Sequence, residues 1–325
     1  MKAGSAARRV ELPSGPSSTE TLELFNQTLE DIFEKVDTTE GGRGNTSISY
    51  DDEELLTRDE LSDLSRATTD LSNLGLLKSI KSSQIVRLLD VLEKQIAQGE
   101  SIDINEDDNE RNSSNVQNIL KALDAVSISL QILGAPDMPK EIYREESIDV
   151  IINFVKYHTF HNVFVFFDAS YYQIHRGEKE LQPDGAAAEN HDNDTENRTP
   201  TKKGKKGASA KSAQTPGKRM SLGGGLNGKE IPKPARKIND LLSGILTQLA
   251  HLLFTIHLPD ATVLQLTSLG TAALTVDGVD LIQAKAVDMV VAAFKQYPEH
   301  RGLILDNLLL AFLKLPTSGR NLRRY

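Results

Sequence analysis

Residues 235–325 constrain the fold most, because amphipathic helices follow one another there on very short connections. In the first predicted helix, apolar residues recur at three- and four-residue steps and so fall on one helix face. These residues are Ile238, Leu241, Leu242, Ile245, Leu249, Leu252, Leu253 and Ile256. One helix cannot bury so wide a face alone. Further helices are predicted over about 259–273, 279–297 and 299–314, and helices joined by tight turns are typical of antiparallel stacks.

The same spacing predicts helices earlier in the chain. Within residues 59–98 two helical patterns break near Ser82, which indicates a helical hairpin. A helix over about 115–133 ends at a Gly-Ala-Pro sequence, and another runs over about 141–158. Thr19 begins a short helix that glycines and an acidic run separate from the others, so we expect it to be isolated.

The helices from residue 115 onward sort into pairs. They are 115–133 with 141–158, 237–257 with 259–273, and 279–297 with 299–314. Each pair occupies roughly 35 to 45 residues, the size of a HEAT-type unit, whereas the Trp/Leu/Gly/Tyr signature of tetratricopeptide repeats is missing. No stretch alternates apolar and polar residues for long enough to build a sheet. The sequence therefore predicts an all-α fold, an irregular HEAT-type helical solenoid with long disordered insertions.

Composition divides the chain into segments. We expect a disordered tail at 1–18, an isolated helix and acidic linker at 19–58, and N-terminal helical repeats at 59–176. A disordered insertion at 177–234, acidic and then basic, is followed at 235–325 by HEAT-type helical repeats that are truncated at the C-terminus. A solenoid tolerates such an insertion because the cost of closing a loop grows only as the logarithm of its length.

The basic part of the insertion stands out in an acidic chain of formal net charge −9. Residues 198–237 contain twelve Lys and Arg and a single acidic residue, Glu230. Such a block is typical of a segment that binds a polyanion, and a solvated linker is the alternative. Thr199 and Thr215 precede prolines and are candidate phosphorylation sites, where phosphate would reduce the positive charge. The candidate DNA-binding or nuclear import residues are Lys202, Lys203, Lys205, Lys206, Lys211, Lys218 and Arg219.

Missing features argue against several classes of protein. No run of about 18 apolar residues is present, so no membrane span is expected. The N-terminus has no apolar segment of the kind found in a secretory signal. Without cysteine there are neither disulfides nor thiolate chemistry. We expect an intracellular protein.

Three groups of residues resemble functional sites. His158 and His161 have the spacing of two metal ligands, but zinc requires three or four and no further cluster lies nearby, so helix-end packing is expected. The acidic loop 99–114 lacks the spacing and the glycine of a calcium loop. An aromatic run has no interleaved basic residues, which favours core packing of a short helix over base stacking. It comprises Phe164, Phe166, Phe167, Tyr171 and Tyr172.

No catalytic arrangement is recognisable in the sequence. The histidines are scattered, cysteine is absent, and the acidic runs lie in predicted loops. A nucleophile, a base and an orienting group therefore do not come together. We expect a protein that is not an enzyme and that has no metal or cofactor site.

Four stretches resemble the Nipped-B family of cohesin loaders, also called sister chromatid cohesion loading proteins, in the family's order. The first three are 135–143 (Ala-Pro-Asp-Met-Pro-Lys-Glu-Ile-Tyr), 155–158 (Val-Lys-Tyr-His) and 262–270 (Thr-Val-Leu-Gln-Leu-Thr-Ser-Leu-Gly). The most specific runs from 297–305 (Tyr-Pro-Glu-His-Arg-Gly-Leu-Ile-Leu) through 315–323 (Leu-Pro-Thr-Ser-Gly-Arg-Asn-Leu-Arg). The resemblance covers 59–325, interrupted by the insertion.

The resemblance implies a nuclear, chromatin-associated factor that is not an enzyme. Family members help to load the cohesin SMC complex onto DNA, support sister chromatid cohesion and stimulate the cohesin ATPase. Their N-terminus binds a tetratricopeptide partner, and here that segment would fall near 19–36. They are much longer solenoids, so the chain resembles an N-terminal piece that stops in mid-solenoid.

Neither a membrane nor a small-molecule substrate is implied by the resemblance. The alternative is a general HEAT-repeat scaffold or adaptor unrelated to cohesin, which shares the fold. It predicts no binding to cohesin or to the tetratricopeptide partner, so a pull-down from nuclear extract separates the two hypotheses.

Overall fold

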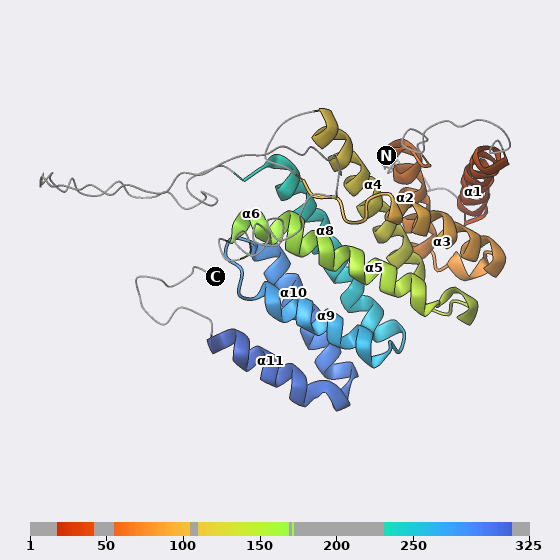
Figure 1. Ribbon diagram of the computed structural model, residues 1–325. Coiled ribbons are helices and arrows are strands. Elements are labelled where there is room, and N and C mark those ends of the chain that lie inside the picture. The colour runs from red at the N-terminus through yellow and green to blue at the C-terminus, as the bar shows by residue number, and fades with distance from the viewer. Residues whose placement is uncertain (1–17, 42–54, 105–109, 169–170, 172–230, 314–325) are drawn as a thin grey trace, which may run out of the picture.

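The computed structural model describes residues 18–41, 55–104, 110–168, 171 and 231–313, and every regular element in these ranges is a helix (Figure 1). The predicted all-α fold is therefore confirmed. The expected tail at 1–18 and insertion at 177–234 lie almost entirely outside the described residues. No helix within these ranges has the length and apolar character that crossing a membrane requires.

The α-helices begin and end close to the predicted positions. A capping box fixes the start of α2, because the Glu60 amide donates to the Thr57 hydroxyl at 3.3 Å and the Thr57 amide donates to the Glu60 carboxylate at 2.7 Å. α8 begins inside the expected insertion, since Pro234 in its first turn has a φ suited to a helix start. The bounds are α1 Ser18–Gly41, α2 Arg58–Asn73, α3 Ser82–Ala97, α4 Glu110–Leu133, α5 Glu145–His158, α6 Val165–Phe167, α8 Lys233–Thr255, α9 Asp260–Ala273, α10 Asp280–Gln296 and α11 Arg301–Leu313.

The helices form two layers. In one layer α2, α4, α8 and α10 lie side by side, and in the other α3, α5, α9 and α11 do so. Figure 1 shows α5, α9 and α11 in succession across the molecule. Between the layers, α3 packs on α4 and α9 packs on α10, and one hydrophobic core runs through the stack. Two stacked helical layers are the architecture of a HEAT-type solenoid, which confirms the predicted fold class.

The predicted pairing of consecutive helices is wrong for two of the pairs. Residues 115–133 and 141–158 are not close packing partners, and neither are 237–257 and 259–273. Instead α4 packs mainly on α2, α3 and α8, while α8 packs mainly on α10 and α4. Each helix has a wide apolar face, which several neighbours in the stack cover together. Helical periodicity indicates which residues are buried but not which helix buries them.

The N-terminal helix α1 is not isolated, contrary to the prediction. It packs on α2 and α3, and Phe25 and Leu29 are fully buried. Lys35 Nζ lies 2.8 Å from a carboxylate oxygen of Glu60 on α2. The glycines and acidic residues that suggested isolation lie mostly in 42–54, outside the described residues, and a linker of that composition does not prevent the helix from returning to the core.

The expected short third helix is continuous with α5. After His158 the chain passes through a π-helix, Thr159–Phe164, into α6, and the π-helix packs on α8. Phe164 and Phe166 are buried, which confirms the predicted core packing for these two rings. Phe167 and Tyr171 are partly buried against the core, and Tyr172 lies outside the described residues.

Candidate interaction surface

Helix α11 has apolar side chains on almost every side. Ile304 and Ala311 are buried, where the helix contacts α9 and α10. A helix that is apolar all round is ordinarily buried all round. The exposed side chains, which we call the end face, are Leu303, Leu305, Leu309, Leu310, Phe312 and Leu313. Within the described structure these side chains are 46% to 81% exposed.

The position of α11 explains why its apolar side chains are exposed. An inner helix such as α8 has a neighbour on each side within its layer, whereas α11 is the last described helix of its layer and has only α9. Helix α10, the last described helix of the other layer, also exposes Leu281, Val287 and Val291. Exposed apolar side chains that gather in this way are typical of a surface that another protein element, a ligand or a membrane covers.

The stretch 297–305, which carried the most specific part of the resemblance, ties successive helices together. Tyr297 is fully buried and ends α10. Its phenolic oxygen accepts a hydrogen bond from the Leu258 amide at 2.9 Å and donates to the Ile256 carbonyl at 3.4 Å, so it holds the turn between α8 and α9. Burial raises the pKa of the Tyr297 hydroxyl, which stays protonated.

Arg301 makes further contacts at the C-terminal end of α10, next to Tyr297. Its Nε donates to the Phe294 carbonyl at 2.8 Å, and its terminal nitrogen donates to the Lys295 carbonyl at 3.2 Å. The guanidinium lies 5.2 Å from the centre of the Phe294 ring. Arg301 therefore satisfies carbonyls at the C-terminus of α10, where a positive charge is favourable.

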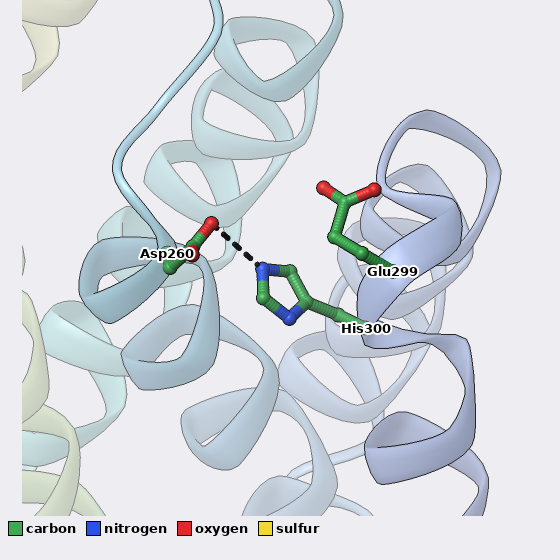
Figure 2. Close-up of side chains that lie close together, drawn as sticks. All are labelled: Asp260, Glu299 and His300. Carbon is green, nitrogen blue, oxygen red and sulfur yellow. Dashed lines mark hydrogen bonds and ion pairs between the residues drawn. The ribbon is translucent and has the colours of Figure 1, made fainter.

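Figure 2 shows a further contact made by the stretch 297–305, in which the His300 side chain points toward Asp260. His300 Nε2 lies 3.1 Å from Asp260 Oδ1, which links the turn before α11 to the first turn of α9. The potential ligand atoms of Asp260, Glu299 and His300 all lie within 4.8 Å of one another. Both carboxylates are exposed, and such groups are common without an ion. We therefore interpret the cluster as a side-chain contact that holds two turns together.

A buried polar network joins α5 to the segment that follows α3. His158 Nε2 lies 3.0 Å from the Gly99 carbonyl oxygen, and His158 Nδ1 lies 2.7 Å from the Asn162 amide nitrogen. Because that amide nitrogen only donates, Nδ1 accepts and Nε2 carries the proton. Asn162 also accepts from the Ile104 amide at 2.8 Å and donates to the Ile102 carbonyl at 2.6 Å.

His158 packs at the end of a helix, as the sequence predicted. His158 is the last residue of α5 and is fully buried, which confirms helix-end packing for it. The ring of His161 stacks on that of Tyr157 with centres 4.4 Å apart. Burial lowers the pKa of His158 to about 4, so its imidazole is neutral at pH 7.

The sequence-predicted DNA-binding and phosphorylation residues are not part of the described structure. Thr199, Thr215 and the seven basic residues at 202–219 lie outside it, as does the last matching stretch, 315–323. The end face and the Asp260–His300 contact were missed by sequence reasoning. The almost continuous apolar run at 303–313 was a local signal for the first, whereas the second joins residues 40 positions apart and has no local signal.

Fold and surface together define a HEAT-type helical-repeat protein. No family model matches the chain. It is similar to "Nipped-B-like protein B" of Danio rerio, with 26% identity over 318 residues, which is 94% of this chain and 10% of that protein. It is also similar to human "Nipped-B-like protein", with 24% identity over 321 residues, which is 96% of this chain and 10% of that protein. The resemblance to the Nipped-B family is therefore confirmed.

A solved structure shares the fold. The "Chaetomium thermophilum cohesin loader SCC2, C-terminal fragment" matches with a TM-score of 0.60 and 13% sequence identity, over 91% of this chain and 21% of that one. The chain spans about a tenth of the length of the curated relatives that it matches.

Proposed function

We propose that the chain is a non-enzymatic module of a cohesin loader, which helps to load cohesin onto chromatin in the nucleus and supports sister chromatid cohesion. The similarity to Nipped-B-like proteins over nearly the whole chain supports this proposal. The fold that the chain shares with a solved cohesin loader fragment is in agreement with it. The module would act by binding partner molecules, because helical stacks of this kind provide long surfaces for partners.

The exposure of the end face supports the proposal that the module acts within a longer solenoid. The contact of α9 with α11 repeats within one layer the contact of α5 with α9. A further helix pair stacked in the same direction would cover Leu309, Leu310 and Phe312 as α11 covers α9. We therefore assign the end face to the next HEAT-type repeat of the solenoid.

The proposed partners are cohesin, chromatin DNA and a tetratricopeptide protein. The basic residues at 202–219 would hold DNA phosphates without reading sequence, and this binding would weaken as salt rises. The tetratricopeptide protein would bind near 19–36, where α1 exposes Leu24 while its opposite face packs on α2 and α3. Stimulation of the cohesin ATPase is part of the same proposal.

A pull-down with a defined complex tests the function. The purified chain is immobilised and incubated with purified cohesin, and bound SMC subunits are detected by immunoblot. We expect both the unaltered chain and a variant lacking 198–219 to retain cohesin. In a separate DNA-binding measurement, we expect the variant to bind DNA more weakly than the unaltered chain. A folded chain that retains no cohesin would favour the unrelated scaffold, and equal DNA affinity after the deletion would remove the DNA role.

A further inference from the structure

A groove lies between α2, α4 and α8, away from the end face. Its volume is about 210 Å³. Leu123, Leu241 and Ile245 supply an apolar part of its lining. The charged side chains that line it among the described residues are both carboxylates, Asp124 on α4 and Asp240 on α8. The groove thus combines an apolar wall with negative charge.

Gly244 widens this groove. It lies in the middle of α8, where glycine disfavours the helix relative to alanine. A Cβ placed on Gly244 would meet no atom within 4 Å, so no close packing in the described structure requires a glycine there. Its consequence for the surface is the space that it leaves in the wall of the groove.

Asp124 is a half-buried carboxylate without a close partner. Burial raises the pKa of its carboxyl, while the charges of Arg58 and Lys237 act in the opposite direction. No ion pair or hydrogen bond to the Asp124 side chain is found among the described residues. A partly desolvated carboxylate is stabilised most by a cation that also donates hydrogen bonds to it.

The neighbouring amide adds a second unsatisfied acceptor. Gln248 Nε2 donates to the Ser127 hydroxyl at 3.0 Å and to the Ser127 carbonyl at 3.3 Å. The Gln248 Oε1 atom is buried and has no hydrogen-bond donor among the described residues. The donors among the lining side chains are the Ser65 and Ser127 hydroxyls and the Gln248 amide, which already bonds Ser127. The carboxylates and the unpaired amide oxygen accept, so the groove favours a ligand that is rich in donors over a phosphate.

We propose that this groove binds a lysine or arginine side chain carried by an extended segment of another protein. Both side chains carry only donors at their charged end and an apolar stem before it. The stem would lie along Leu241 and Ile245, and the charged end would reach Asp124 and Asp240. The groove shares no lining residue with the end face.

The test is a peptide selection on the full chain. Two libraries of phage-displayed random nonapeptides are used, one with a fixed central arginine and one with a fixed central glutamate. The best peptide is then synthesised with a fluorophore, and its Kd is measured by fluorescence anisotropy. We expect enrichment from the arginine library alone and a Kd raised at least about tenfold by Asp124→Asn and by Gly244→Leu.

Gly244→Leu separates loss of binding from loss of fold. Because the site is open, this variant should melt at or above the temperature of the unaltered chain. Gly302→Leu is the matched control, since Gly302 lies in α11 and a Cβ there also meets nothing within 4 Å. Its Kd should stay within about twofold of the unaltered value.

Three outcomes would overturn the proposal. The first is that the arginine library gives no enrichment, or no more than the glutamate library. The second is that Gly244→Leu leaves the Kd of the peptide unchanged. The third is that the peptide binds with a lower Kd when the seven basic residues at 202–219 are replaced by alanine. The last result would mean that the chain's own basic segment occupies the groove instead of another protein.

Discussion

The Tyr297 phenolic oxygen lies 2.9 Å from the Leu258 amide nitrogen, so the end of α10 holds the turn between α8 and α9. Leu258 is itself buried, and within the described structure its amide has this hydroxyl as its hydrogen-bond partner. The His257 ring stacks on Tyr297 with centres 5.2 Å apart. One side chain thus fixes the spacing between two successive units of the solenoid.

Tyr297→Phe removes this hydroxyl and leaves the Leu258 amide buried without an acceptor. We expect a loss of about 1–3 kcal/mol of unfolding free energy, the usual cost of an unsatisfied buried donor. Urea unfolding followed by circular dichroism measures it. Tyr143→Phe is the control, because Tyr143 is only partly buried, and it should change stability by less than about 0.5 kcal/mol. Equal effects of the two substitutions would contradict the assigned role of Tyr297.

The neutral state of His158 makes the fold sensitive to acid. Its folded pKa of about 4 lies below the ordinary value of 6.5, so the unfolded chain binds a proton first as the pH falls. The His158 contribution to stability is therefore complete above pH 6.5 and is lost between about pH 6.5 and 4, by up to about 3 kcal/mol.

Urea unfolding at several pH values separates this effect from other titrations. His158→Gln should be less stable than the unaltered chain at pH 7.5, and the difference should shrink as the pH approaches 4. Tyr297→Phe is the control, because the pKa of Tyr297 is raised above its ordinary value and its hydroxyl does not titrate in this range, so its difference from the unaltered chain should stay constant. A constant difference between His158→Gln and the unaltered chain across this range would show that His158 is not the group responsible.

Asn162 connects three partners, and its loss should loosen the segment after α3. Asn162→Leu removes the hydrogen bonds to Ile102, Ile104 and His158 while it keeps a similar volume. We expect a cost of about 3 kcal/mol or more, because several buried groups lose their partners together. Hydrogen exchange at the Ile104 amide should accelerate more than exchange in α8. Uniform acceleration across both would indicate global destabilisation without a specific role for the network.

The sequence predicted the buried faces of the helices better than their neighbours. Of the predicted stripe, Ile238, Leu242, Ile245, Leu249, Leu252 and Leu253 are buried and Leu241 and Ile256 are partly buried, because helical periodicity is a local property. The packing of α8 on α10 and α4 was not predictable, since it depends on which apolar faces meet after the chain folds. The same limit applies to the Asp260–His300 contact and to the partners of Asn162. Local spacing carries no information on contacts made across the stack.

Gly270 allows α9 and α10 to approach closely. A Cβ on Gly270 would lie 2.6 Å from Val290 Cγ2 and 3.3 Å from the Ala286 carbonyl oxygen. Gly270→Ala should therefore cost about 1–3 kcal/mol from overpacking, offset in part by about 1 kcal/mol of helix propensity. Gly302→Ala, where the added atom meets nothing within 4 Å, should instead stabilise the chain by about 0.5–1 kcal/mol. Thermal melts compare the two variants, and a stabilising Gly270→Ala would contradict the close approach.

The end face should make the isolated chain associate with itself. Leu309 is 60% exposed and Leu313 is 81% exposed, so apolar surface faces water. Leu309→Glu should leave the unfolding free energy within about 0.5 kcal/mol of the unaltered value, because an exposed side chain loses little packing. Leu309→Glu should also lower the sedimentation coefficient at high concentration by disfavouring association.

Thr247→Glu is the control, because it makes an equally charged change at an exposed position of α8, and it should leave association unchanged. Since both variants add one negative charge, a difference between them isolates the apolar contact, whereas equal reductions would mean that net charge and not the end face governs association.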